Sequence, residues 1–171
     1  MDIEVLAEDD WKVLQNVRLT ALKESPDAFL YTYQDEADWS EARWRTRIST
    51  DTWMVVRIDQ QVVAVACTVR PDDRPTDERH LESVWVDPLH RRKGVLRAIL
   101  RYLIESNPDV HTWMAWVLDG NDDARAAYQR VGFESTGERQ ALTEPRPCIE
   151  ERLRLDRNAA ISASTDPEPA S

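Results

Sequence analysis

Cysteine and glycine are both scarce in this sequence of 171 residues, which has two cysteines and four glycines. Cys67 lies within an apolar run, and neither it nor Cys148 belongs to a CxxC pair or stands beside a group of histidines. This pattern gives no support to a disulfide framework or a zinc site, so we expect two reduced thiols and no metal. So few glycines also exclude a flexible glycine-rich linker, which favours one compact unit.

Long apolar runs and an excess of positive charge are also absent. The longest apolar runs, residues 62–67 and 113–118, are far shorter than the roughly 20 residues that cross a bilayer. The 22 Lys and Arg residues are outnumbered by 32 Asp and Glu residues, and the net charge of -10 is opposite to that of a typical nucleic-acid binder. Because the N-terminus is acidic and has no signal-peptide pattern, we expect a cytoplasmic protein with no membrane or nucleic-acid partner.

The hydrophobic periodicity of the chain alternates between that of strands and that of helices. Helical spacing predicts helices over residues 8–24, 38–48, 92–106 and 121–131. Runs rich in β-branched or alternating apolar residues predict strands over residues 3–6, 52–58, 62–70, 80–86, 111–118, 133–142 and 148–155. This order predicts one α/β (α+β) domain over residues 1–157, with a mixed sheet and helices on both faces. Residues 158–171 are rich in Ala, Ser, Pro and acidic residues, which predicts a disordered tail.

The helix predicted for residues 92–106 begins with residues that normally destabilise a helix start. Arg91, Arg92 and Lys93 crowd the positive end of the helix dipole, and Gly94 in the first turn costs about 1 kcal/mol relative to alanine. A bound anion would compensate for both unfavourable features, the crowded cations and the glycine. The free N–H groups of the first turn would donate to phosphate oxygens, and the cations would neutralise the charge of the anion. The other interpretation is a solvated basic loop, and these residues alone leave the two alternatives open.

Two sequence patterns resemble motifs of the GNAT superfamily of acetyl-CoA-dependent N-acetyltransferases. The first resembles motif A of that family and reads Val86-x-Pro88-x-x-Arg91-x-x-Gly94-x-Leu96, with Leu96 where the family usually has Gly or Ala. The second resembles motif B and reads Asn121-x-x-Ala124-x-x-x-Tyr128-x-x-x-Gly132-Phe133-x-x-x-Gly137. The resemblance implies a GNAT-like, mostly antiparallel sheet, splayed between the strands at 80–86 and 111–118, with acetyl-CoA in the opening.

The resemblance also implies where the acetyl-CoA co-substrate binds. The pyrophosphate is expected at the backbone N–H groups of residues 91–96, and the pantetheine along the strand edge at Trp85 and Val86. The N–H of Val86 is the implied donor that polarises the thioester carbonyl. The full set of implied cofactor-binding residues is Trp85, Val86, Arg91, Arg92, Lys93, Gly94, Val95, Leu96, Asn121 and Ala124.

Tyr128 matches the general-acid tyrosine of the family, since a phenol with an unperturbed pKa of about 10 can protonate a departing thiolate. Its spacing with Ala124 and Val131, taken alone, is more typical of a core aromatic residue. The candidates for the general base are His80, Glu82 and a water molecule. The two side chains stand two positions apart on one predicted strand, so both fall on one face. The alternative is that His80 and Glu82 pair with each other at a strand end.

The acceptor pocket implied by the resemblance lies between the first two helices and the last two strands. It places Phe29, Tyr31, Tyr33 and Trp39 on one side and the hairpin at residues 140–147 on the other. Aromatic rings with carboxylates nearby suit a small cationic amine. We therefore expect an N-acetyltransferase that moves the acetyl group directly from acetyl-CoA to a primary amine of a small molecule or peptide, with a homodimer left open. The alternatives are a protein N-terminal or lysine acetyltransferase and a catalytically silent acyl-CoA-binding sensor.

Overall fold

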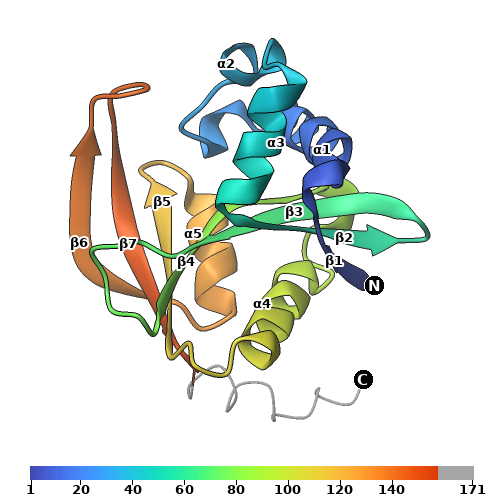
Figure 1. Ribbon diagram of the computed structural model, residues 1–171. Helices are drawn as coiled ribbons and strands as arrows, with labels where there is room; N and C mark the ends of the chain where they lie inside the picture. Colours follow the sequence, from blue (N-terminus) through green and yellow to red (C-terminus); the bar gives the residue numbers. More distant parts are fainter. Residues whose placement is uncertain (158–171) are drawn as a thin grey trace.

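Seven strands form one sheet in the computed structural model, which describes residues 1–157 (Figure 1). The strands are β1 (Asp2–Val5), β2 (Thr52–Ile58), β3 (Gln61–Val69), β4 (Glu78–Val86), β5 (Thr112–Leu118), β6 (Glu134–Leu142) and β7 (Cys148–Asp156). Their order in the sheet is β1-β2-β3-β4-β5-β7-β6, and all neighbours are antiparallel except the parallel pair β4 and β5. The predicted mixed, mostly antiparallel sheet is therefore confirmed. The tail predicted for residues 158–171 lies outside the described residues.

Helices cover both faces of this sheet (Figure 1). The first face, called the α1 face below, carries α1 (Trp11–Glu24), α2 (Tyr33–Ala37) and α3 (Glu41–Thr50). The second, called the α4 face, carries α4 (Val95–Ser106) and α5 (Asp122–Arg130). Short 3₁₀ turns occur at Glu8–Asp10, Pro26–Ala28 and Pro88–His90. None of the helices in residues 1–157 is both long and apolar enough to cross a membrane.

Three details of the helices differ from the sequence prediction. The helix expected from residue 38 begins at Glu41, because the hydroxyl of Ser40 accepts from the N–H of Arg43 and caps the helix there. The helix expected from residue 92 begins at Val95, because Gly94 adopts a left-handed conformation outside the helix. The sequence does not predict α2, whose five residues are too few to display helical periodicity.

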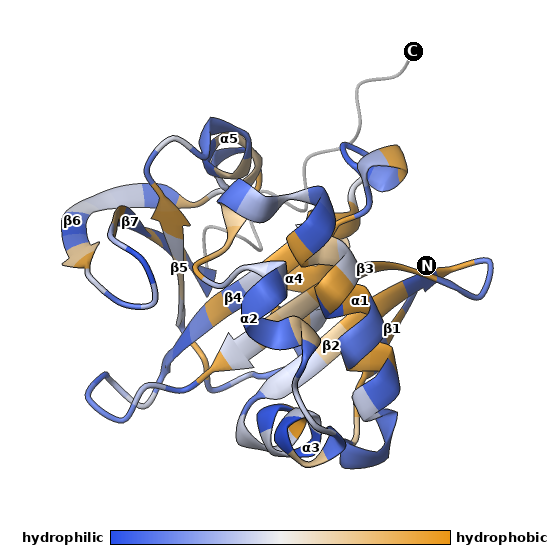
Figure 2. Cartoon of the chain, turned by 90° about the horizontal axis from the view of Figure 1, so that it is seen from above, coloured by the Kyte–Doolittle hydropathy of each residue, from blue (hydrophilic) through white to orange (hydrophobic). Residues whose placement is uncertain are grey.

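Alternate residues of the central strands face two separate hydrophobic cores. On β2, Met54 and Val56 are buried against α4 and α5, whereas Trp53 and Val55 are buried against α1 and α3. Figure 2 shows apolar residues concentrated in the central strands and in α4, while the edge strand β6 is hydrophilic. Because side chains alternate along a strand, the same pattern assigns each polar residue of the central strands to the α1 face or to the α4 face.

The sheet opens between β4 and β5. These two strands pair only at Glu78 with Thr112, Arg79 with Trp113 and His80 with Met114, although β4 continues to Val86 and β5 to Leu118. The paired part is called the closed end below, and the unpaired part from residue 84 onward the open end. The register between β3 and β4 shifts beside Ser83, whose φ of 53° marks a bulge that bends β4. The predicted splay between the fourth and fifth strands is therefore confirmed.

Candidate active site

The loop that follows β4 presents a row of free backbone donors at the open end. Arg92 and Gly94 have φ values of 61° and 79°, so the chain turns sharply before α4 begins. Within residues 1–157, none of the N–H groups of residues 92–97 donates to another protein group. A Cβ at Gly94 would meet no described atom within 4 Å, so the backbone conformation, and not lack of space, requires glycine. Free N–H groups at a helix N-terminus form an anion-binding cradle.

The side chain of Arg91 connects this loop by hydrogen bonds to β4 and to the end of α1. Its Nε donates to the carbonyl of Val86 at 3.0 Å, and its Nη2 donates to Glu24 and to the hydroxyl of Ser25. Trp85 donates from its indole Nε1 to the same Glu24 carboxylate at 2.9 Å. Burial opposes the ionisation of Glu24, but the hydrogen bonds from Ser25, Trp85 and Arg91 outweigh it and lower the pKa of Glu24. The side chains of Trp85 and Arg91 therefore make contacts within the protein. The N–H of Arg91 donates to the carbonyl of Pro88, and Trp85 pairs with Val65 of β3, so a role of either residue in binding acetyl-CoA stays a prediction.

Arg91, Arg92 and Lys93 are all exposed cations of the loop, but unlike Arg91, neither Arg92 nor Lys93 forms an ion pair within the described part of the chain. Two other motif residues, Leu96 and Asn121, contact the protein itself. Leu96 is partly buried and packs against the core of the α4 face, so its side chain does not obstruct its own N–H. Asn121 caps α5 by accepting from the N–H of Ala124 at 3.1 Å.

The N–H of Val86 points into the splay. The N–H of the next residue, Asp87, donates to Val63 of β3 at 2.8 Å, and successive N–H groups of a strand point to opposite edges. Val86 therefore directs its N–H toward the edge from which β5 has separated. A donor in this position can polarise a carbonyl group held between the strands.

Tyr128 lies on α5 among the core residues of the α4 face. Its ring packs edge-to-face against Phe133 with 5.0 Å between ring centroids, and its hydroxyl forms no hydrogen bond to the described residues. Burial, and then the negative charge of Glu82, raise the pKa of Tyr128. Because Glu82 lies on the opposite face of the sheet, the two side chains approach each other through the opening between β4 and β5. A phenol in this environment keeps its proton at neutral pH, which suits a donor.

His80 and Glu82 share the α1 face, as predicted, but they do not pair with each other. The Nε2 of buried His80 lies 2.9 Å from Glu78 Oε1, and Arg152 of β7 donates to the same oxygen at 2.6 Å. His80 therefore belongs to a buried polar network at the closed end. Glu82 lies where the splay begins. Burial is the main reason that its pKa is raised, and the negative charges of Asp51 and Glu150 add to the effect, while His80 opposes it.

Several residues beside Glu82 were missed by the sequence analysis. Glu150 of β7 is buried on the α1 face, where burial raises its pKa although Gln140 donates to it. Arg18 and Glu36 form a buried ion pair at 2.8 Å, and Arg18 also reaches the hydroxyl of Ser83 on the β4 bulge at 3.4 Å. Arg18 could have been noticed in the sequence, because it is a charged residue on the apolar stripe of α1. Nothing in the sequence alone places Glu150 beside Glu82.

The aromatic residues expected to bind the acceptor amine are largely covered by the cations of the protein itself. The guanidinium of Arg18 lies 4.8 Å from the centroid of the Phe29 ring. The cations of Lys23 and Arg43 cover the Tyr33 and Trp39 rings at 4.2 and 4.0 Å. Only Tyr31 of the four is classed as exposed. Cations of the protein itself therefore lie over three of the four rings, and the part of these residues in acceptor binding stays a prediction.

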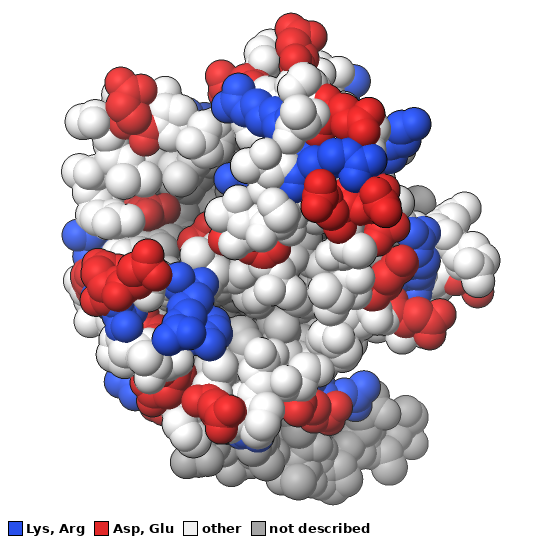
Figure 3. Space-filling model, viewed as in Figure 1, with Lys and Arg blue, Asp and Glu red and all other residues white. Residues whose placement is uncertain are grey.

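The open surface lies instead between the helices of the α1 face and the β6–β7 hairpin. Figure 3 shows this side of the molecule hollowed, with acidic side chains along the border of the hollow. Arg146 of the hairpin donates to the carbonyl of Phe29, so the hairpin contacts the segment between α1 and α2. Residues 1–157 contain no group of three or more His, Cys, Asp or Glu side chains arranged to hold a metal ion.

Comparison with known proteins agrees with this geometry. The sequence model described as "Acetyltransferase (GNAT) family" matches residues 19–133. The uncharacterised N-acetyltransferase YafP of Escherichia coli is 25% identical over 108 residues, which is 61% of this chain and 63% of that relative. The crystal structure of smu.2055 from Streptococcus mutans has a TM-score of 0.71 at 19% identity and covers 92% of this chain and 99% of that one. The structure of yncA from Salmonella typhimurium with its cofactor acetyl-CoA has a TM-score of 0.62 at 18% identity, covering 100% and 97%.

Proposed function

Because the chain belongs to the acetyltransferase (GNAT) family, we propose that it is an acetyl-CoA-dependent N-acetyltransferase that transfers the acetyl group directly to a primary amine. The observation that carries this proposal is the row of unpartnered N–H groups of residues 92–97 at the open end of the β4–β5 pair. These donors, together with Arg92 and Lys93, fit the charge and the hydrogen-bonding needs of a pyrophosphate. Acetyl-CoA supplies an activated thioester at this site.

The residues of the chain take complementary roles in the transfer. Val86 donates its N–H to the thioester oxygen and stabilises the charge that develops there. Glu82, directly or through a water, accepts a proton from the ammonium so that the neutral amine attacks the carbonyl carbon. As the carbon–nitrogen bond forms and the carbon–sulfur bond breaks, Tyr128 gives its proton to the departing sulfur. The nitrogen loses its remaining extra proton at the same stage, and this proton restores the phenol of Tyr128, directly or through water. The raised pKa values of Glu82 and Tyr128 support this division of base and acid.

The electrostatics of the α1 face favour a cationic acceptor. Glu82 and Glu150 lie on this face without a cation paired to either, within the described residues. The charge of Glu150 helps to raise the pKa of Glu82, so an acceptor with a second positive charge would relieve the repulsion between these two carboxylates. The Arg146 contact with Phe29 narrows access between the hairpin and the helices, which favours a small molecule over a long peptide.

A thiol-release assay with acetyl-CoA tests the proposal directly. The acceptor panel contains diamines, monoamines of equal length, amino acids and short peptides. We expect release with diamines to exceed that with monoamines, and Glu150→Gln to reduce this preference while leaving acetyl-CoA affinity unchanged. Tight acetyl-CoA binding with no thiol release across the whole panel would support a catalytically silent sensor instead.

A further inference from the structure

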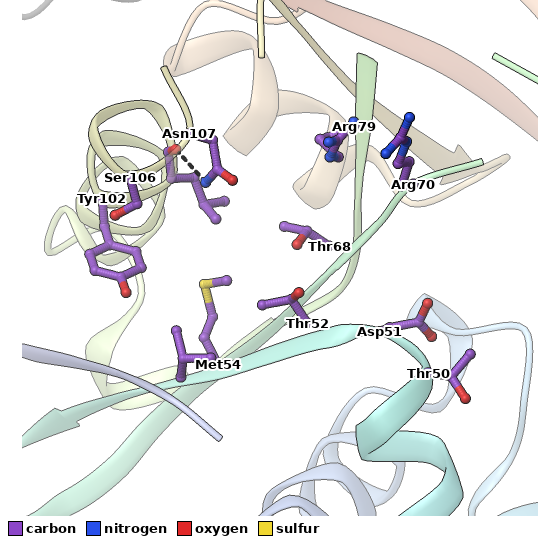
Figure 4. A pocket seen from close by; sticks show the side chains of 12 residues that line it. Thr50, Asp51, Thr52, Met54, Thr68, Arg70, Arg79, Tyr102, Ser106 and Asn107 are labelled. Atoms are coloured by element: carbon purple, nitrogen blue, oxygen red, sulfur yellow. Dashed lines mark hydrogen bonds between the residues drawn. The ribbon is translucent and has the colours of Figure 1, made fainter. Parts of the chain in front are cut away.

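A pocket lies on the α4 face of the sheet, away from the loop at the open end (Figure 4). Its volume is about 360 Å³. It borders the C-terminal end of α4, whereas the free N–H groups lie at the N-terminal end. The pocket residues of this segment run from Tyr102 to Asn107, so at 1.5 Å per residue they lie roughly 10–18 Å from Val95 along the helix axis. The pocket is therefore separate from the proposed acetyl-CoA site.

Two neighbouring arginines give this pocket a positive charge. Arg70 follows β3 and Arg79 lies on β4, and Figure 4 shows them next to each other. Burial, and then the charge of Arg70, lower the pKa of Arg79. Among residues 1–157, Arg79 donates only to the carbonyls of Thr76 and Glu78, at 2.9 and 2.7 Å. Neither arginine has a carboxylate within ion-pair distance in the described part of the chain.

Such a pair is unexpected in a protein with 32 acidic and 22 basic residues. Asp51 also borders the pocket, but its charge acts on Cys67 and Glu82, whose side chains lie on the opposite face. Two like charges held together without a counter-charge cost free energy in the folded protein, and a bound anion would recover it.

The rest of the lining supplies neutral hydrogen-bond donors. Thr52 and Thr68 project from the sheet between the arginines and α4, and Tyr102 and Ser106 project from the helix (Figure 4). A guanidinium presents N–H groups in a fork that matches two oxygens of one anionic group, and hydroxyls can donate to the remaining oxygens. We propose that this pocket binds the carboxylate or phosphate group of a small-molecule ligand other than acetyl-CoA.

Calorimetry with the full chain tests this proposal. Inorganic phosphate and succinate are titrated separately into protein saturated with acetyl-CoA, so that the N–H groups of residues 92–97 are already occupied. We expect saturable binding of at least one of the two anions, and the stronger binder identifies the anionic group. Arg70→Gln should weaken that binding about tenfold, because a charge-assisted bidentate contact is lost. Arg70 is exposed, so its replacement leaves the fold intact.

Arg101→Gln is the matched control, because it removes the same charge from an exposed position of α4 outside the pocket. It should leave anion affinity unchanged, and Arg79→Gln should reproduce the loss seen with Arg70→Gln. Absence of saturable binding by either anion, or equal losses in Arg70→Gln and Arg101→Gln, would overturn the proposal. The comparison of variants holds even if acetyl-CoA fails to bind, an outcome that would count against the proposed function and not against the pocket.

Discussion

The two ends of the β4–β5 pair contrast in how their polar groups are satisfied. At the closed end, His80, Glu78 and Arg152 form a buried chain of contacts that continues from Arg152 to Glu138 at 2.8 Å. At the open end, the N–H of Val86 and those of residues 92–97 have no strand or helix partner. Free N–H groups at the start of a helix, with exposed cations beside them, favour the binding of an anionic group there. The closed end joins β4 to β5 and β7, and the open end is where we propose that acetyl-CoA binds.

The largest expected effect concerns the acid at the open end. Tyr128→Phe keeps the packing against Phe133 and removes only the hydroxyl, so the maximal rate should fall by about 10²–10⁴-fold. Steady-state kinetics on an acceptor found in the panel measure this loss. Calorimetry should show acetyl-CoA affinity unchanged. A variant that keeps most of its maximal rate would identify Tyr128 as a core residue only.

At the closed end the expected effect is on stability. Arg152→Met leaves the buried carboxylate of Glu78 without its cation, and breaking a buried pair in this way costs about 3–5 kcal/mol. Thermal unfolding should therefore show a Tm lower by roughly 2–4 °C for each kcal/mol lost. Arg154→Met on the same strand is the control, since Arg154 is half-exposed and pairs only with Asp156. Equal Tm losses in both variants would contradict the structural role of the closed end.

The pH dependence of the rate distinguishes the two candidate bases. A carboxylate accepts a proton only when ionised, so the rate should fall as the pH falls through the raised pKa of Glu82. Glu82→Gln should lower the rate at neutral pH by about 10²-fold and remove this acidic limb. His80→Gln should keep the fall in rate at low pH but move it to higher pH. The reason is that His80 lowers the pKa of Glu82, so removing His80 raises that pKa. Loss of the limb in His80→Gln alone would make His80 the base.

The smallest expected effect concerns acetyl-CoA affinity and the loop that precedes α4. Gly94→Val forces a β-branched residue to a φ of 79°, and the distorted loop should weaken acetyl-CoA binding about tenfold. Gly137→Val is matched in strain, with a φ of 77° and equally open surroundings, but lies on β6. Calorimetry should show normal affinity for this control and a smaller loss for Arg92→Gln with Lys93→Gln, since exposed charges are screened. The opposite order would exclude a site built from backbone donors.

Local sequence predicts much of the fold and the open end. The strand and helix order follows from periodicity, and the basic residues with Gly94 mark the loop because they contradict the usual preferences of a helix start. Both kinds of signal lie within a few residues, so no knowledge of distant contacts is needed. The resemblance to motif A and motif B rests on the same local patterns.

The closed end could not be predicted in the same way. Glu78 and Glu82 are each two residues from His80 and share its face, so strand periodicity cannot choose its partner. The choice depends on Arg152, which comes from β7, 74 residues away from Glu78 in the sequence. The cation over Phe29 could not be predicted for a similar reason, because the position of Arg18 over this ring follows from the packing of α1 and not from spacing in the sequence.

Helix α1 touches both the loop and the bulge of β4. Glu24 in its last turn holds Trp85 and Arg91, and Arg18 holds Ser83. The same helix contributes to the acceptor side through the Arg18–Glu36 pair. Because these contacts all start from one helix, a shift in the packing of α1 would displace the loop before α4 and the bulge of β4 together. The position of α1 therefore links the proposed acetyl-CoA site to the proposed acceptor side.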